Sequence, residues 1–134
     1  MPASPARAPN VIDLTSSSPL SPTSWWRSKK PDTFSRKDIE RIRLALLGSR
    51  LPDEPDWRRA VLGDASTAIR VAVEQLKTKP IGAPEIDLAL SAVLCCALEG
   101  NAASAVLVSS ALRRRSKIDW PCRKLSLLWL VADF

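Results

Sequence analysis

Two apolar segments joined through one glycine constrain most strongly what this chain can fold into. Residues 88–98 contain no charged side chain, and neither do residues 101–112, which follow Gly100. Neither segment has a wide polar face, and both are shorter than the roughly 20 residues that span a bilayer. We therefore predict that residues 84–99 and 102–112 form a buried helical hairpin at the centre of a bundle.

Residues that begin and end helices divide the rest of the chain. Ser35 and Asp38 approximate a capping box, Gly48 marks a helix end, and Asp64 and Asn101 are caps. We expect a helix from Ser35 to Gly48, a short helical turn over 57–62, and helices over 65–77, 84–99, 102–112 and from Asp119 to the end. The last of these carries Leu125, Leu128, Trp129 and Val131 as apolar positions. No alternating strand pattern is present. The predicted fold class is all-α: a small single-domain helical bundle of about five short helices over residues 35–134.

The first 34 residues differ in composition from the rest. Six of the eleven prolines fall before residue 32, together with seven serines. Such a segment buries too little apolar surface to offset its ordering entropy, so we expect residues 1–34 to be a disordered tail. The adjacent Trp25 and Trp26 are either a docking patch or the place where the tail lies on the domain; we favour the second.

The tail also contains the most specific local pattern, Asn10-Val11-Ile12-Asp13-Leu14-Thr15 followed by three serines. An apolar, β-favouring core followed by hydroxyl residues resembles a SUMO-interacting motif. The resemblance implies binding to a SUMO-like protein by addition of an extended strand to a sheet edge. Serines stand where such motifs usually carry acidic residues, and phosphorylation would supply that charge. The candidate partner-binding residues are Val11, Ile12, Asp13, Leu14, Thr15, Ser16, Ser17 and Ser18.

The charge favours anionic partners without choosing among them. Twenty bases against fourteen acids give a net charge of +6, shared between tail and domain. Nucleic acid, acidic protein and anionic lipid all fit, and so does a protein that is simply basic. The candidate phosphate contacts are Arg113, Arg114, Arg115 and Lys117, although we favour their role in complementing the helix dipole. Residues 102–112 offer only serines to base edges, so any nucleic-acid binding should be non-specific.

Catalysis and metal binding are not expected. The chain has no histidine and no tyrosine, lacks a glycine-rich phosphate loop, and places five of its fourteen acids at helix starts, where capping and dipole roles account for them. Its three cysteines, Cys95, Cys96 and Cys122, have no zinc-ligand spacing and lie in apolar surroundings. We predict buried, reduced thiols, no metal, no cofactor and no enzymatic activity.

These observations favour a non-enzymatic regulatory or adaptor protein that acts through protein–protein interaction. Reduced thiols and the absence of a Sec signal core or transmembrane segment indicate the cytosol or nucleus. The first 24 residues carry only Arg7 and Asp13 as charges, as in many unfolded secretion signals, so a delivered microbial or viral effector is one form of this hypothesis. The alternative is a basic nucleic-acid-binding accessory protein with weak sequence specificity. A small bacterial protein without a macromolecular partner is the third possibility.

Overall fold

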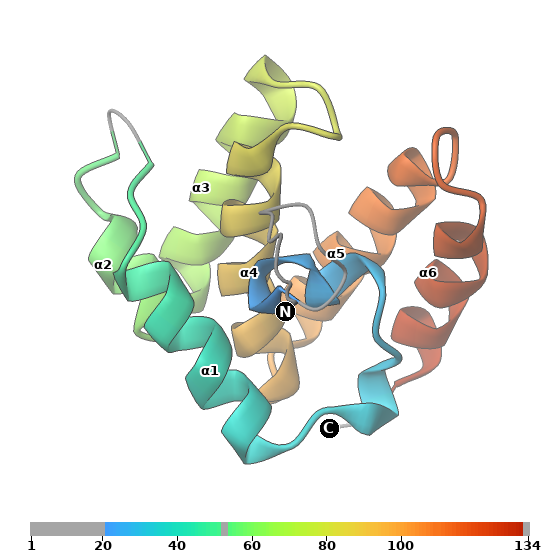
Figure 1. The fold of residues 1–134 in the computed structure, drawn as a ribbon, viewed down its shortest axis with the longest axis horizontal. Coiled ribbons are helices and arrows are strands. Elements are labelled where there is room, and N and C mark those ends of the chain that lie inside the picture. The colour runs from blue at the N-terminus through green and yellow to red at the C-terminus, as the bar shows by residue number, and fades with distance from the viewer. Residues whose placement is uncertain (1–20, 52–53, 133–134) are drawn as a thin grey trace, which may run out of the picture.

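A computed structural model describes residues 21–51 and 54–132, and these ranges contain helices and no strand (Figure 1). The predicted all-α class is therefore confirmed. Two short 3-10 helices precede six α-helices: η1 (Pro22–Arg27), η2 (Pro31–Thr33), α1 (Arg36–Leu47), α2 (Trp57–Val61), α3 (Ala65–Thr78), α4 (Pro84–Leu98), α5 (Ala102–Arg115) and α6 (Pro121–Val131).

The predicted caps set the helix starts. The Ser35 hydroxyl accepts a hydrogen bond from the Asp38 N–H, and the Asp38 carboxylate accepts one from the Ser35 N–H at 2.9 Å. Asp64 and Asn101 each accept from the backbone N–H three residues further on, at 3.1 and 2.8 Å. Gly100 connects α4 and α5 with a φ of 103°, which only glycine adopts without strain. These caps position the starts of α1, α3 and α5 as predicted.

Helix α4 is the centre of the bundle. It packs against α1, α2, α3, α5 and η1, which surround it in Figure 1. Its interior positions are completely buried over three turns, with leucines Leu90 and Leu94 filling space and alanines allowing close approach of neighbouring helices. The prediction that residues 84–99 form a buried central helix is confirmed.

Helix α5 differs from the prediction, because only one side of it is buried. It packs between α4 and α6, and its remaining surface exposes Ala103, Val106 and Ser110. It also continues to Arg115 rather than ending at residue 112. Alanine and serine cost little when exposed, so an uncharged composition did not require a fully buried helix.

The predicted tail boundary at residue 34 needs correction, because residues 21–34 belong to the folded domain. Trp26 is completely buried, and its indole N–H donates to the Asp87 carboxylate at 2.8 Å. The Ser91 hydroxyl donates to the Thr23 carbonyl at 3.0 Å. The expectation that the tryptophan pair marks where the segment lies on the domain is thus confirmed. Phe34 continues the contact, with its ring 6.3 Å from that of Trp129.

Candidate docking surface on α6

Large apolar side chains that face solvent are concentrated near the C-terminus of the described chain. Of nine such side chains, six lie between residues 106 and 131. Three of them, Leu127, Leu130 and Val131, follow one another at helical spacing on α6, and we call them the apolar ridge. Val131, one of the apolar positions expected on the last helix, is 79% exposed.

The ridge is exposed because α6 has few neighbours. This helix packs mainly on α5 and buries Cys122, Leu125 and Trp129 on that side. Among the described residues, no helix covers its opposite side. A helix that is apolar on both sides therefore keeps one apolar side in solvent, which is unusual for a small domain with a well-packed core.

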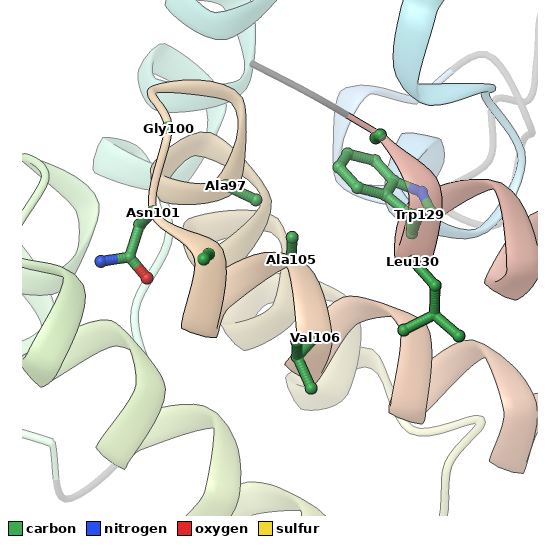
Figure 2. Close-up of a pocket in the computed structure, with 9 residues that line it drawn as sticks. Ala97, Gly100, Asn101, Ala105, Val106, Trp129 and Leu130 are labelled. Atoms are coloured by element: carbon green, nitrogen blue, oxygen red, sulfur yellow. The ribbon is translucent and has the colours of Figure 1, made fainter.

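A hollow of about 200 Å³ borders the ridge on one side, between the α4–α5 turn and the C-terminal half of α6. Figure 2 shows Trp129 and Leu130, from α6, on one side of this hollow and Ala105 and Val106, from α5, on the other. Apart from the polar side chain of Asn101, its lining side chains are apolar. The Asn101 amide oxygen is already engaged in capping α5. The hollow can accept an apolar group.

A groove borders the ridge on the other side, between α6 and the segment that contains η1 and η2. It consists of two adjoining hollows of about 360 and 380 Å³, which share Lys30, Lys124 and Leu128. Leu125 and Val131 add apolar surface. The charged side chains that line the groove are the bases Arg27, Lys30 and Lys124 and the acids Asp32 and Asp119. The ridge with its flanking hollow and groove forms a continuous apolar surface, bordered on the groove side by charged side chains among which bases outnumber acids.

The four predicted phosphate contacts lie together at the C-terminal end of α5 but differ in their surroundings. Arg113 and Lys117 are exposed, and Arg114 reaches toward the Leu76 carbonyl at 3.5 Å. Arg115 is engaged within the domain, where it donates to the Ile81 carbonyl and lies 3.7 Å from the Asp119 carboxylate. Its guanidinium therefore links the α3–α4 loop to the end of α5.

Two further bases, neither of which was predicted from the sequence, join this end of the domain. Arg123 lies over the ring of Trp120 at 5.4 Å, and Lys124 is exposed one residue further on. A signal for Lys124 was present, because Trp120, Lys124 and Leu127 are spaced along one side of a helix. That spacing becomes informative only once this side is known to face solvent.

The chemistry of the described residues agrees with buried, unreactive thiols. Burial raises the pKa of Cys95 to about 12 and that of Cys122 to about 11, and it also raises the pKa of Cys96. All three are free and buried, as predicted. Within the described ranges, acidic and cysteine side chains do not gather in a group of three that would suit a metal ion. Over the same ranges, no helix combines the length and apolar character needed to cross a bilayer.

The tail residues from Val11 to Ser18 lie outside the described residues, so their predicted role stays a prediction. No protein-family model, curated protein or solved structure matches the chain.

Proposed function

We propose that this protein is a non-enzymatic adaptor that binds another protein through α6. The observation that supports this proposal is the apolar ridge of Leu127, Leu130 and Val131 between a hollow and a groove. Exposed apolar side chains next to recesses are typical of the centre of protein interfaces, where large side chains enter pockets on the partner. On this proposal the protein acts in the cytosol or nucleus.

The chemistry of the surface indicates the kind of segment that would bind. Apolar side chains of the partner would cover the ridge and enter the hollow next to Trp129 and the groove over Leu128. Lys30 and Lys124 at the groove edge, with Arg123 nearby on α6, would favour carboxylates flanking those apolar positions. An amphipathic segment with acidic flanks combines both features.

The test is a pair of matched double variants. Leu127→Ser with Leu130→Ser removes both leucines of the ridge, and Leu44→Ser with Leu62→Ser removes two leucines of comparable exposure on α1 and after α2. Exposed substitutions of this kind should change the free energy of unfolding by about 0.5 kcal/mol or less. Proximity labelling in cells should identify a partner that wild type and the control variant both label and that the ridge variant loses.

The same partner, once purified, should bind the ridge variant at least about tenfold more weakly than it binds the control variant, because central apolar contacts carry most of an interface's affinity. If the two double variants label the same proteins and bind them equally, the α6 surface is not the docking site and this proposal is wrong.

The tail would provide a second contact through its resemblance to a SUMO-interacting motif. A peptide of residues 8–22 should bind a SUMO-type protein with micromolar or weaker affinity, since one short strand bears its own ordering cost. NMR titration should show shifts confined to the exposed strand edge, strengthened by phosphorylation at Ser16–Ser18 and abolished by Ile12→Ala with Leu14→Ala. Absence of shifts at millimolar peptide, phosphorylated or not, would reject the motif.

A further inference from the structure

The turn between α5 and α6 exposes two large apolar side chains at one end of the bundle. Trp120 is 69% exposed and Ile118 is 64% exposed. Both precede α6 and are distinct from the apolar ridge, which lies in the C-terminal half of that helix. We call these two residues the apolar tip.

Structural contacts place the apolar tip beside the loop that joins α3 and α4. A Cβ added at Gly82 would lie 3.7 Å from the Ile118 Cδ1 atom, and Arg115 donates a hydrogen bond to the Ile81 carbonyl. In Figure 1 the α3–α4 and α5–α6 turns lie at the same end of the molecule, the upper end in that view. The C-terminal ends of α3 and α5 therefore contribute to one surface around the tip.

This end carries an uncompensated positive charge. Residues 77–85 and 113–124 together contain eight bases and two acids, and one of those acids, Asp119, lies near Arg115. Elsewhere the arginines at 27, 43, 59 and 70 are paired with carboxylates. Among the described residues, six exposed bases at this end form no ion pair: Lys77, Arg113, Arg114, Lys117, Arg123 and Lys124.

We propose that this end of the domain binds the surface of an anionic lipid bilayer. Tryptophan is favoured at the level of the lipid headgroups, and an adjacent aliphatic side chain can reach the acyl boundary. The surrounding lysines and arginines would contact lipid phosphates, each adding attraction to an anionic leaflet. Trp120 and Ile118 insert, and the bases hold the domain at the surface.

The arrangement of the tip favours lipid over nucleic acid. An exposed isoleucine contributes nothing to phosphate contacts, whereas insertion into a bilayer buries it. Proteins that bind nucleic acid also arrange their basic side chains along a groove that follows the nucleic-acid backbone. Here the basic side chains instead surround two apolar side chains. This inference does not depend on the proposed protein-docking role of α6.

The experiment uses the full chain and sucrose-loaded vesicles of phosphatidylcholine, alone or with about 30 mol% phosphatidylserine. Sedimentation should show binding to the anionic vesicles that weakens with salt, and little binding to the neutral ones. Tryptophan emission should shift to shorter wavelength on binding and be quenched by brominated lipids. Trp120 should dominate this signal, because Trp26, Trp57 and Trp129 are buried and Trp25 is half-buried.

Two pairs of variants separate charge from insertion. Arg113→Ser with Lys117→Ser should lower the partition coefficient about 30-fold, whereas Lys37→Ser with Arg41→Ser removes the same charge from α1 and should lower it much less. Ile118→Ala with Trp120→Ala should abolish the emission shift and weaken binding, and Leu44→Ala with Leu62→Ala should do neither. Circular dichroism of every variant verifies that it is folded.

Three outcomes would overturn the proposal. The first is failure of the wild-type chain to bind anionic vesicles at low salt. The second is equal loss of binding in the tip variants and their matched controls, which would indicate a diffuse charge effect. The third is tighter binding to an oligonucleotide than to vesicles, lost in the Trp120 variant, which would assign this end to nucleic acid.

Discussion

Replacing Trp26 tests most directly whether residues 21–34 are part of the folded domain. The side chain is completely buried against α4. A buried tryptophan removes about 150–250 Å² from water, which at about 25 cal/mol per Å² corresponds to roughly 4–6 kcal/mol. Because unfolded chains already bury part of this area, we expect Trp26→Ala to lower the free energy of unfolding by about 3–5 kcal/mol.

Trp26→Phe separates packing from hydrogen bonding. Phenylalanine keeps most of the apolar contact but loses the N–H that donates to Asp87. Asp87 would still accept hydrogen bonds from Arg27 at 3.1 and 3.3 Å, so no buried charge is left without a partner. We therefore expect a smaller loss, about 1–2 kcal/mol.

Urea unfolding followed by far-UV circular dichroism measures both values without relying on tryptophan emission. At roughly 4 °C per kcal/mol, Trp26→Ala should also lower the Tm by about 12–20 °C. Fragment 35–134 should be destabilised at least as much relative to fragment 21–134. A loss below about 1 kcal/mol for Trp26→Ala would show that this segment does not support the domain.

Three further measurements test other parts of the structure. Leu94→Ala should lower the free energy of unfolding by about 2–5 kcal/mol because Leu94 is completely buried, whereas Leu107→Ala should lower it less because Leu107 is half-buried. Equal losses of stability in urea unfolding would contradict the central position of α4. The hydrogen bond from Arg43 to the Glu99 carboxylate lowers the pKa of Glu99 below its ordinary value of 4.5. The pair therefore stabilises the fold above the pKa that Glu99 has in the unfolded chain, and this stabilisation is lost as the pH falls through the lowered pKa. Arg43→Met should therefore reduce stability at pH 7 more than at pH 3, with the ion pair itself contributing less than about 1 kcal/mol because Glu99 is half exposed. An aromatic disulfide reagent at pH 8 should label the buried thiols of Cys95, Cys96 and Cys122 slowly in the native protein and completely in denaturant. Fast labelling of the native protein would contradict the burial of these thiols.

Helix starts were predictable because their signals are local. Ser35, Asp64 and Asn101 satisfy backbone N–H groups within three residues of themselves, so sequence alone specifies the contact. The end of α5 was less certain, since arginine is a good helix former and Arg113 to Arg115 extend the helix as readily as they end it.

The order of residues 21–34 could not be predicted from local composition. Proline and serine make this segment unfavourable for a helix or a core, yet Trp26 binds Asp87, which lies 61 residues away in the sequence. A composition argument sums over neighbours along the chain and cannot include one buried aromatic side chain that packs at a distance. The tryptophan pair in an otherwise polar segment was the only signal for this contact.

The exposed side of α6 was hidden for a related reason. Leu127, Leu130 and Val131 look like core residues in the sequence, because an apolar pattern does not reveal how many neighbours a helix has. The last helix packs mainly on α5, and its contacts with the segment before α1 are few, such as Cys122 with Arg27 and Trp129 with Phe34. Sequence periodicity thus predicted the helix and its buried side, whereas the candidate site depends on which side remains uncovered.

The two proposed surfaces lie at opposite ends of α6 and need not compete. Trp120, at the membrane-facing tip, and Leu130, on the ridge, are ten residues apart, which corresponds to about 15 Å along a helix. Sites separated by more than about 7–10 Å and without shared partners usually contribute additively. Arg123 and Lys124 lie between them and carry charge that suits both an acidic partner segment and an anionic leaflet. A protein bound along the ridge would then be held next to the bilayer, so that one short helix would link membrane attachment to partner capture.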